Sequence, residues 1–349
     1  MTKEIVLALD AMGGDKAPDM VIKGANIARV RHPQVRFKFF GDSKAIDPVL
    51  NRFKRLKPVS SVHHAEEVVE DDLKPSVALR QRRKSSMRLA IDAVKTGDAD
   101  GIVSAGNTGA MMAFAKLSLR TLPGINRPAM VSVFPTERSE CVMLDLGANI
   151  DCDSVTLVQF AMMGEVFARN VLGVHEPTVG LLNIGTEELK GNETIRQAAA
   201  ILRDADLPIK FHGFIEGNDI AAGTVDVVVT DGFAGNVALK TAEGVAKLYI
   251  EYMRSAFRRG LLSRIGFLLA RPALRALRDR VDPRAYNGGT FLGLNGVAVK
   301  SHGGTDHKGF ANALSVAVDM IEQGVNPKII EELERVNLDD VPDIARAAV

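Results

Sequence analysis

The sequence predicts an α/β protein built on a mainly parallel sheet with helices on both faces. Short apolar runs alternate with longer segments whose apolar residues recur at helical spacing, almost from end to end of the 349 residues. Such alternation is typical of βαβ units. Neither a low-complexity linker nor an internal repeat interrupts it. We therefore expect one catalytic α/β unit over residues 1–349, with insertions, and not two independent domains.

The predicted elements follow from the spacing of apolar residues along the chain. Apolar runs of strand length lie at residues 5–9, 35–40, 101–104, 129–134, 141–144, 178–184, 209–214, 226–230 and 296–300. Segments with helical spacing lie at residues 76–95, 108–119, 154–170, 193–205 and 236–254. Most predicted strands are followed by a helix or a glycine-rich turn, which is the order that a parallel sheet requires.

Composition excludes several classes of function. Lysine plus arginine (44) almost equals aspartate plus glutamate (43), so we expect no broad basic face and no nucleic-acid partner. Cys141 and Cys152 lack metal-ligand or disulfide-framework spacing, and we expect neither a metal nor a cofactor. The N-terminal residues lack the pattern of a signal peptide, and no apolar run is long enough to span a membrane. These features predict a cytoplasmic protein.

One basic amphipathic stretch, residues 247–284, breaks the pattern. It holds ten arginines or lysines against three acids. Pro272 fits the first turn of a second helix, so we expect an inserted helical hairpin with an apolar edge. Two interpretations are compatible with this pattern: the apolar side packs on the core or on a second subunit, or it contacts a membrane surface. A dimer that presents the tip satisfies both. The candidate membrane-contact residues are Leu261, Leu262, Ile265, Phe267, Leu268 and Leu269.

Four glycine-rich turns follow predicted strands, and we number them in chain order. Turn 1 (residues 10–18) has paired glycines that let the backbone approach an anion, although it matches neither the GxGxxG nor the P-loop pattern. A tight strand-to-helix turn explains it equally well. Its candidate substrate-binding and phosphate-binding residues are Asp10, Gly13, Gly14, Asp15 and Lys16.

Turn 2 (residues 104–110) opens a helix, where free N–H groups and the helix dipole attract an anion. Ordinary helix capping by Asn107 or Thr108 is the alternative. The candidate phosphate-binding residues of this turn are Ser104, Gly106, Asn107 and Thr108.

Turn 3 (residues 183–193) and turn 4 (residues 230–236) supply amide, hydroxyl, carboxylate and ammonium groups. Candidate residues are Asn183, Gly185, Thr186 and Lys190 in turn 3, and Asp231, Gly232 and Asn236 in turn 4. Because the carboxyl ends of parallel strands share one edge of a sheet, we expect the four turns to converge on one crevice. His302, after the last predicted strand, is either a donor into this crevice or a structural histidine.

The runs LALDAMGGDKAP, GIVSAGNTGAMMA, LLNIGTEELKGNE and VVTDGFAGNVALKT, in this order, resemble the bacterial phosphate acyltransferase family of phospholipid synthesis. The resemblance covers nearly the whole chain. It implies a fold similar to phosphotransacetylase and to the isocitrate and isopropylmalate dehydrogenases, and a homodimer. It also implies transfer of a long-chain acyl group from acyl carrier protein to inorganic phosphate. The acyl phosphate would then feed a membrane-bound glycerol-3-phosphate acyltransferase, which favours an enzyme at the inner face of the cell membrane.

The residues are compatible with this chemistry, because phosphate is itself the nucleophile and a thiolate leaves. The reaction needs proximity and donors for a developing oxyanion. We assign phosphate binding to turns 1 and 2 with Lys190, and the oxyanion to Asn183, Asn236 or His302. Asp15, Lys16 and Asp231 are candidates for orienting the substrate. A phosphotransacetylase using a short acyl-CoA, a nicotinamide-dependent dehydrogenase and a non-enzymatic membrane-surface scaffold are the competing hypotheses.

Overall fold

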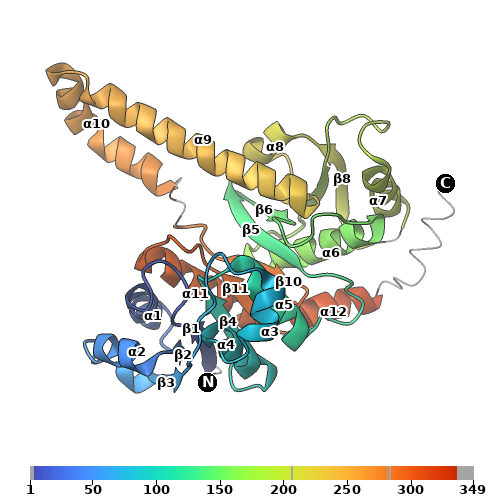
Figure 1. Ribbon diagram of the computed structural model, residues 1–349. Helices are drawn as coiled ribbons and strands as arrows, with labels where there is room; N and C mark the ends of the chain where they lie inside the picture. Colours follow the sequence, from blue (N-terminus) through green and yellow to red (C-terminus); the bar gives the residue numbers. More distant parts are fainter. Residues whose placement is uncertain (1–3, 206, 281, 283, 336–349) are drawn as a thin grey trace.

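The computed structural model describes residues 4–205, 207–280, 282 and 284–335. Within them, one 11-stranded sheet runs through the molecule in the order β3-β2-β1-β4-β11-β10-β5-β6-β9-β7-β8 (Figure 1). The strands are β1 (Ile5–Asp10), β2 (Val35–Gly41), β3 (Ser60–His64), β4 (Gly101–Ser104), β5 (Ala129–Pro135), β6 (Glu140–Leu144), β7 (Thr178–Leu182), β8 (Lys210–Ile215), β9 (Val227–Val229), β10 (Gly289–Leu292) and β11 (Val297–Lys300).

Helices lie on both faces of this sheet, as predicted (Figure 1). They are α1 (Asp19–Arg31), α2 (Ser43–Leu50), α3 (Pro75–Gln81), α4 (Ser86–Lys95), α5 (Thr108–Leu119), α6 (Ser154–Val171), α7 (Glu193–Asp204), α8 (Gly217–Ala222), α9 (Gly232–Arg258), α10 (Leu261–Arg280), α11 (His307–Glu322) and α12 (Val325–Arg335). A short 3-10 helix spans Lys57–Val59.

The sheet reverses direction at its centre. Strand β10 is antiparallel to both β11 and β5, and β5 is antiparallel to β6. The other pairings are parallel, so the group β3-β2-β1-β4-β11 runs opposite to the group β6-β9-β7-β8. The prediction that all four turns share one edge is therefore wrong. Turns 1 and 2 follow strands of the first group, whereas turns 3 and 4 follow strands of the second.

Apolar clusters on the two faces hold the helices to the sheet. On one face, α1 and α11 pack on the first strand group and α6 on the second, and all three contribute to the largest buried cluster. On the other face of the first group, α4 and α5 bury Met87 and Phe114 against Ala8 and Ile102. Successive residues of β1, such as Leu7 and Ala8, thus point to opposite faces of the sheet, as strand geometry requires.

Helices α9 and α10 form a hairpin that projects from the body of the molecule (Figure 1). The turn between them lies at Arg259 and Gly260. The ring of Phe257 in α9 packs edge to face on the ring of Phe267 in α10, with 5.4 Å between the ring centroids. Pro272 lies inside α10 and not in the first turn of a helix, which corrects that part of the prediction. Helix α9 also starts at Gly232, earlier than the expected residue 236. The hairpin therefore begins in turn 4, one of the four candidate glycine-rich turns.

Another predicted helix is divided in two. The segment 76–95 forms α3 and α4, because Ser85 takes an extended conformation and its side chain accepts a hydrogen bond from the N–H of Arg88. This N-cap starts a new helix within a stretch whose apolar spacing alone predicts a continuous one.

An ionic triad with two buried carboxylates and a partly exposed arginine joins α6 to α12. Arg169 donates to Glu332 at 2.8 Å and forms an ion pair with Glu165 at 3.1 Å. Both glutamates are buried, and burial raises the pKa of Glu165. The arginine therefore offsets two carboxylates that have left water.

We expect Arg169→Met to lower the free energy of unfolding by about 3 kcal/mol at pH 7.5, because two buried carboxylates lose their cation. The deficit should shrink as the pH falls toward the raised pKa of Glu165, since protonation removes the charge. Urea unfolding at several pH values measures both effects. Arg254→Met, which removes an exposed pair with Glu251, is the control and should change stability little. Equal losses in the two variants would contradict the interpretation.

Candidate active site

Turns 1 and 2 meet at a buried carboxylate, that of Asp10. Its Oδ1 atom accepts from the Ser86 hydroxyl and its Oδ2 atom from the Ser104 hydroxyl, both at 2.6 Å. The N–H of Gly106 donates in turn to Ser104. Asp10 and Ser104 thus face each other inside the protein and support the turns from behind.

Gly13 and Gly14 allow the two turns to touch. A Cβ atom on Gly13 would lie 2.6 Å from both Asp10 Oδ2 and the nitrogen of Gly106, and Gly14 adopts a φ of +95°. Only glycine accommodates both conditions without displacing its neighbours. The backbone of turn 1 is therefore packed directly against the opening of α5.

Asn107 caps α5 and anchors a neighbouring loop. Its Oδ1 accepts from the N–H of Ala110, and its Nδ2 donates to the carbonyls of Glu70, Asp71 and Leu73. The side chain is thus engaged within the protein. Because the first N–H groups of a helix have no partner within it, the backbone of the first turn of α5 remains the anion-attracting element.

The segment after β11 joins this cluster. The N–H of Asp15 donates to the carbonyl of Gly303 at 3.1 Å, and the N–H of His302 donates to Asn287. The His302 ring is exposed and its Nδ1 accepts from the N–H of Gly304, which leaves Nε2 directed away from that contact. Turn 1, turn 2 and residues 301–304 form what we call the first glycine cluster. Its exposed side chains are those of Asp15, Lys16, Thr108 and His302.

A second buried aspartate, Asp145, organises the loop after β6. Its carboxylate accepts from the N–H groups of Met130, Gly147, Ala148 and Asn149 and from the Asn149 side chain, at 2.7–3.2 Å. Burial raises its pKa, while these donors favour the charged form. The loop 145–149 is consequently held in one shape.

This loop is packed against the start of α9. The N–H of Gly232 donates to the carbonyl of Asn149 at 2.7 Å. A Cβ atom on Gly235 would come within 1.9 Å of the carbonyl oxygen of Asp145. Asp231 is the N-cap of α9, and its carboxylate accepts from the N–H three residues later. We call turn 4 together with residues 145–149 the second glycine cluster.

Two asparagine amides lie beside glycines with positive φ. Asn236 lies against Gly147, with its Oδ1 3.6 Å from the position of a Cβ atom there. In turn 3, Asn183 donates to the carbonyl of Lys190 and lies against Gly191. Its Oδ1 is buried without a hydrogen-bond partner among the residues that the structure describes. The Lys190 ammonium group belongs to an exposed side chain whose stem passes over Gly185 in turn 3.

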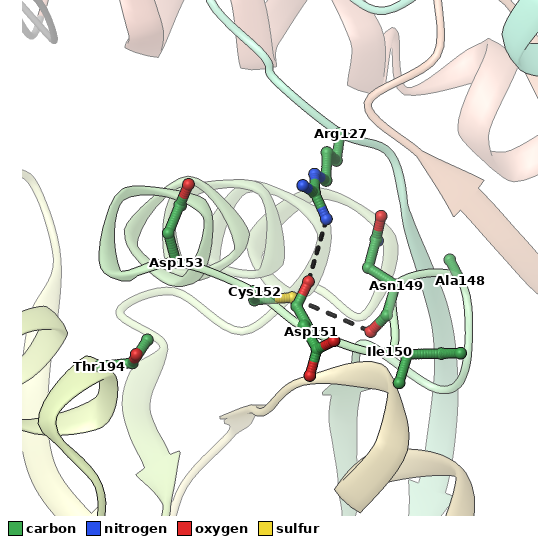
Figure 2. A pocket seen from close by; sticks show the side chains of 8 residues that line it. All are labelled: Arg127, Ala148, Asn149, Ile150, Asp151, Cys152, Asp153 and Thr194. Atoms are coloured by element: carbon green, nitrogen blue, oxygen red, sulfur yellow. Dashed lines mark hydrogen bonds between the residues drawn. The ribbon is translucent and has the colours of Figure 1, made fainter.

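A cavity of about 660 Å³ opens beside the second glycine cluster (Figure 2). Arg127 donates to the carbonyl of Asp151 across it, and Thr194, just beyond turn 3, lies on its far side. Burial raises the pKa of the Cys152 thiol to about 12, so it is not a thiolate nucleophile at neutral pH. The lining residues are Arg127, Ala148, Asn149, Ile150, Asp151, Cys152, Asp153 and Thr194.

Comparisons with known proteins agree with this architecture. The model of the fatty acid synthesis protein family matches residues 5–328. A phosphate acyltransferase of Rhodospirillum centenum is 62% identical over 335 residues, covering 96% of this chain and 94% of its own length. A phosphate acyltransferase of Paramagnetospirillum magneticum is 56% identical over 348 residues, covering 100% of this chain and 99% of its own length.

The chain belongs to the fatty acid synthesis protein family. It is an acyltransferase, as the resemblance predicted. A phosphotransacetylase of Streptococcus pyogenes shares the fold, with a TM-score of 0.64 at 16% identity over 92% of this chain and 95% of that chain. The EutD phosphotransacetylase of Staphylococcus aureus also shares the fold, with a TM-score of 0.59 at 16% identity over 91% of this chain and 94% of that chain. The predicted α/β fold is confirmed.

The sequence patterns did not select Asp145, Asn149 or Arg127 as candidate site residues. A signal for the first two was present, because a strand is followed by an aspartate and a glycine at residues 141–147, as in turn 1. Arg127 gave no such signal, since its place beside the cavity depends on the path of the chain before β5.

We expect Gly235→Ala to destabilise the protein by about 2–3 kcal/mol, because the added methyl group overlaps the backbone of Asp145. Acyl transfer should fall by about 100-fold if the second glycine cluster lies in the active site, since misplacement of 1 Å has that effect. Gly244→Ala is the matched control. It lies in the same helix with open space around it and should stabilise the protein by about 0.5–1 kcal/mol. Thermal unfolding and the acyl-transfer rate of both variants test this.

Proposed function

We propose that this enzyme transfers a long-chain fatty acyl group from acyl carrier protein to inorganic phosphate. The observation that carries the proposal is the identity of 51–62% to proteins named phosphate acyltransferase along nearly the whole chain. The acyl phosphate would serve phospholipid synthesis through a membrane-bound glycerol-3-phosphate acyltransferase. The family description, fatty acid synthesis protein, supports the choice of a fatty acyl donor.

The proposed reaction needs no nucleophile from the protein. A phosphate oxygen attacks the thioester carbonyl carbon, the carbon–sulfur bond breaks, and the carrier leaves as its thiol after gaining a proton. Both cysteines agree with this route, because burial raises the pKa of Cys141 and of Cys152 to about 12. The enzyme contributes by holding the two substrates together and by donating to the developing oxyanion.

We assign phosphate binding to the first glycine cluster, where the opening of α5 and the backbone of turn 1 meet. Asp10, Ser104 and Asn107 support this surface through their contacts inside the protein. His302 belongs to this cluster and is a candidate for the oxyanion. Asn236, Asn183 and Lys190 belong to turns that follow strands of the opposite group. Their proposed roles, the two asparagines at the oxyanion and the exposed Lys190 ammonium group at the phosphate, therefore require a substrate that reaches both strand groups.

A phosphotransacetylase that uses a short acyl-CoA is the second candidate function. The specific observation in its favour is the shared fold with the two phosphotransacetylases. A likeness at 16% identity concerns the fold, so we place this function second. A non-enzymatic scaffold is disfavoured by the identity to acyltransferases.

The α9–α10 hairpin supplies the proposed contacts with a second subunit and with a membrane surface. Its tip exposes Leu262, Ile265, Phe267, Leu268 and Leu269, with exposed fractions from 41% to 86%. The side chain of Leu261 lies outside the described part of the chain. Among the described residues, no helix combines the length and apolarity needed to cross a membrane. We propose a cytoplasmic homodimer associated peripherally with the inner face of the cell membrane through this exposed apolar tip.

The reaction is tested with palmitoyl-acyl carrier protein and radiolabelled phosphate, and acyl phosphate is trapped by hydroxylamine as the hydroxamate. We expect phosphate-dependent product, and a rate about 100-fold lower in Lys190→Ala because a donor to the substrate is lost. Lys210→Ala, an exposed lysine on the edge strand β8, should keep the wild-type rate. Turnover with acetyl-CoA but not with palmitoyl-acyl carrier protein would favour the phosphotransacetylase. The absence of turnover with any thioester would refute an acyltransferase.

We expect Leu268→Glu to weaken sedimentation with vesicles of anionic lipid by about 30-fold, because about 2 kcal/mol of leucine burial is lost and a negative charge is added. Turnover with soluble substrates should persist. Val30→Glu, on an exposed position of α1 outside the hairpin, should sediment as the wild type does. Unchanged binding of the Leu268 variant would contradict the membrane contact.

A further inference from the structure

Asp10, Ser104 and Lys300 end three neighbouring parallel strands at the same level of the sheet. Ser104 is the register partner of Lys300, and the residues preceding Asp10 and Ser104 are also partners. Side chains at one level of parallel strands point to the same face. The three residues are 0–9% exposed. A carboxylate and an ammonium group thus lie in one buried polar row, which the proposed reaction does not otherwise use.

The negative end of this row lies directly behind the first glycine cluster. The Oδ2 atom of Asp10 is 2.6 Å from the position of a Cβ atom on Gly13. Two serine hydroxyls donate to the carboxylate, but neither carries a charge. Burial raises the pKa of Asp10, whereas the hydroxyls and Lys300 act in the opposite direction. A charged Asp10 would oppose any anion held by the turn in front of it.

Lys300 is the cation of this row, two strands away from Asp10 on the same face of the sheet. Its ammonium group donates to the carbonyl of Ser301, and the ionisable groups that act on it are Asp71 in the loop before α3 and, to a smaller extent, Asp10 on β1. That loop is tied to α5 by the Asn107 side chain. Burial lowers the pKa of Lys300 to about 8, so its charge depends on pH close to neutrality.

We propose that Lys300 is a positioning residue that offsets the charge of Asp10, so that the first glycine cluster accepts the phosphate substrate. The inference rests on the proposed function only for the identity of the anion. Lys300 acts through the turn and does not touch phosphate. Its loss leaves an uncompensated buried negative charge behind the anion, and this weakens phosphate binding more than it slows the chemical step.

The test compares Lys300→Met, Lys300→Arg and the double variant Asp10→Asn/Lys300→Met. We expect Lys300→Met to raise the KM for phosphate about 10-fold or more, equal to 1.4 kcal/mol, while kcat changes less than about 3-fold. Lys300→Arg keeps the charge and should restore KM. The double variant removes both charges and should also restore it, which a purely structural role would not produce. An unchanged KM in Lys300→Met, or no rescue in the double variant, overturns the proposal.

A second measurement uses the wild type and does not depend on the folding of Lys300→Met. Sulfate remains doubly charged from pH 7 to pH 9, so its dissociation constant, measured by calorimetry, reports the charge of the site. We expect binding to weaken about 10-fold over this interval as Lys300 loses its proton. Lys300→Arg should show no such change. Binding that is independent of pH in the wild type overturns the proposal, whereas failure of the acyl donor assay alone would concern the proposed function.

Discussion

The three consecutive antiparallel pairings at the centre of the sheet, β11 with β10, β10 with β5 and β5 with β6, are the constraint on which the arrangement of the molecule depends. They let one continuous sheet carry two groups of parallel strands that run in opposite directions. Each group then presents its own carboxyl ends, and each forms one glycine cluster. The hairpin α9–α10 leaves the second group at β9 and returns to the sheet at β10, which runs in the same direction as β9.

Both clusters use the same physical device, a buried aspartate at the end of a strand. Asp10 and Asp145 each gather donors from neighbouring segments and hold a glycine-containing loop against the opening of a helix, α5 or α9. The two differ in how the charge is stabilised. Asp145 accepts from backbone N–H groups and an amide, whereas Asp10 accepts from two hydroxyls and lies in the same row as Lys300. Glycines make the close contact possible in both places.

Sequence predicted the elements well wherever local signals agree with the final packing. Residues 101–104 and 108–119 have the bounds that were expected, since a buried strand, an asparagine cap and a periodic helix follow one another. The reversal of the sheet left no such local signal, because the direction of β10 and β5 is decided by pairing between distant segments. The same limit explains Arg127, whose position depends on tertiary contacts. Among the site candidates, the capping roles of Asn107 and Asp231 were foreseeable from their place before helices.

The base of α9 has a mechanical consequence. This helix has 27 residues and, at 1.5 Å per residue, is about 40 Å long. Its first turn is clamped to the loop 145–149 by the Gly232 hydrogen bond and by the close approach at Gly235. A force applied at the tip therefore acts on this first turn, where Asn236 lies, with a lever arm of about 40 Å. A surface that binds the tip of the hairpin is therefore mechanically coupled to Asn236 at the opposite end of α9.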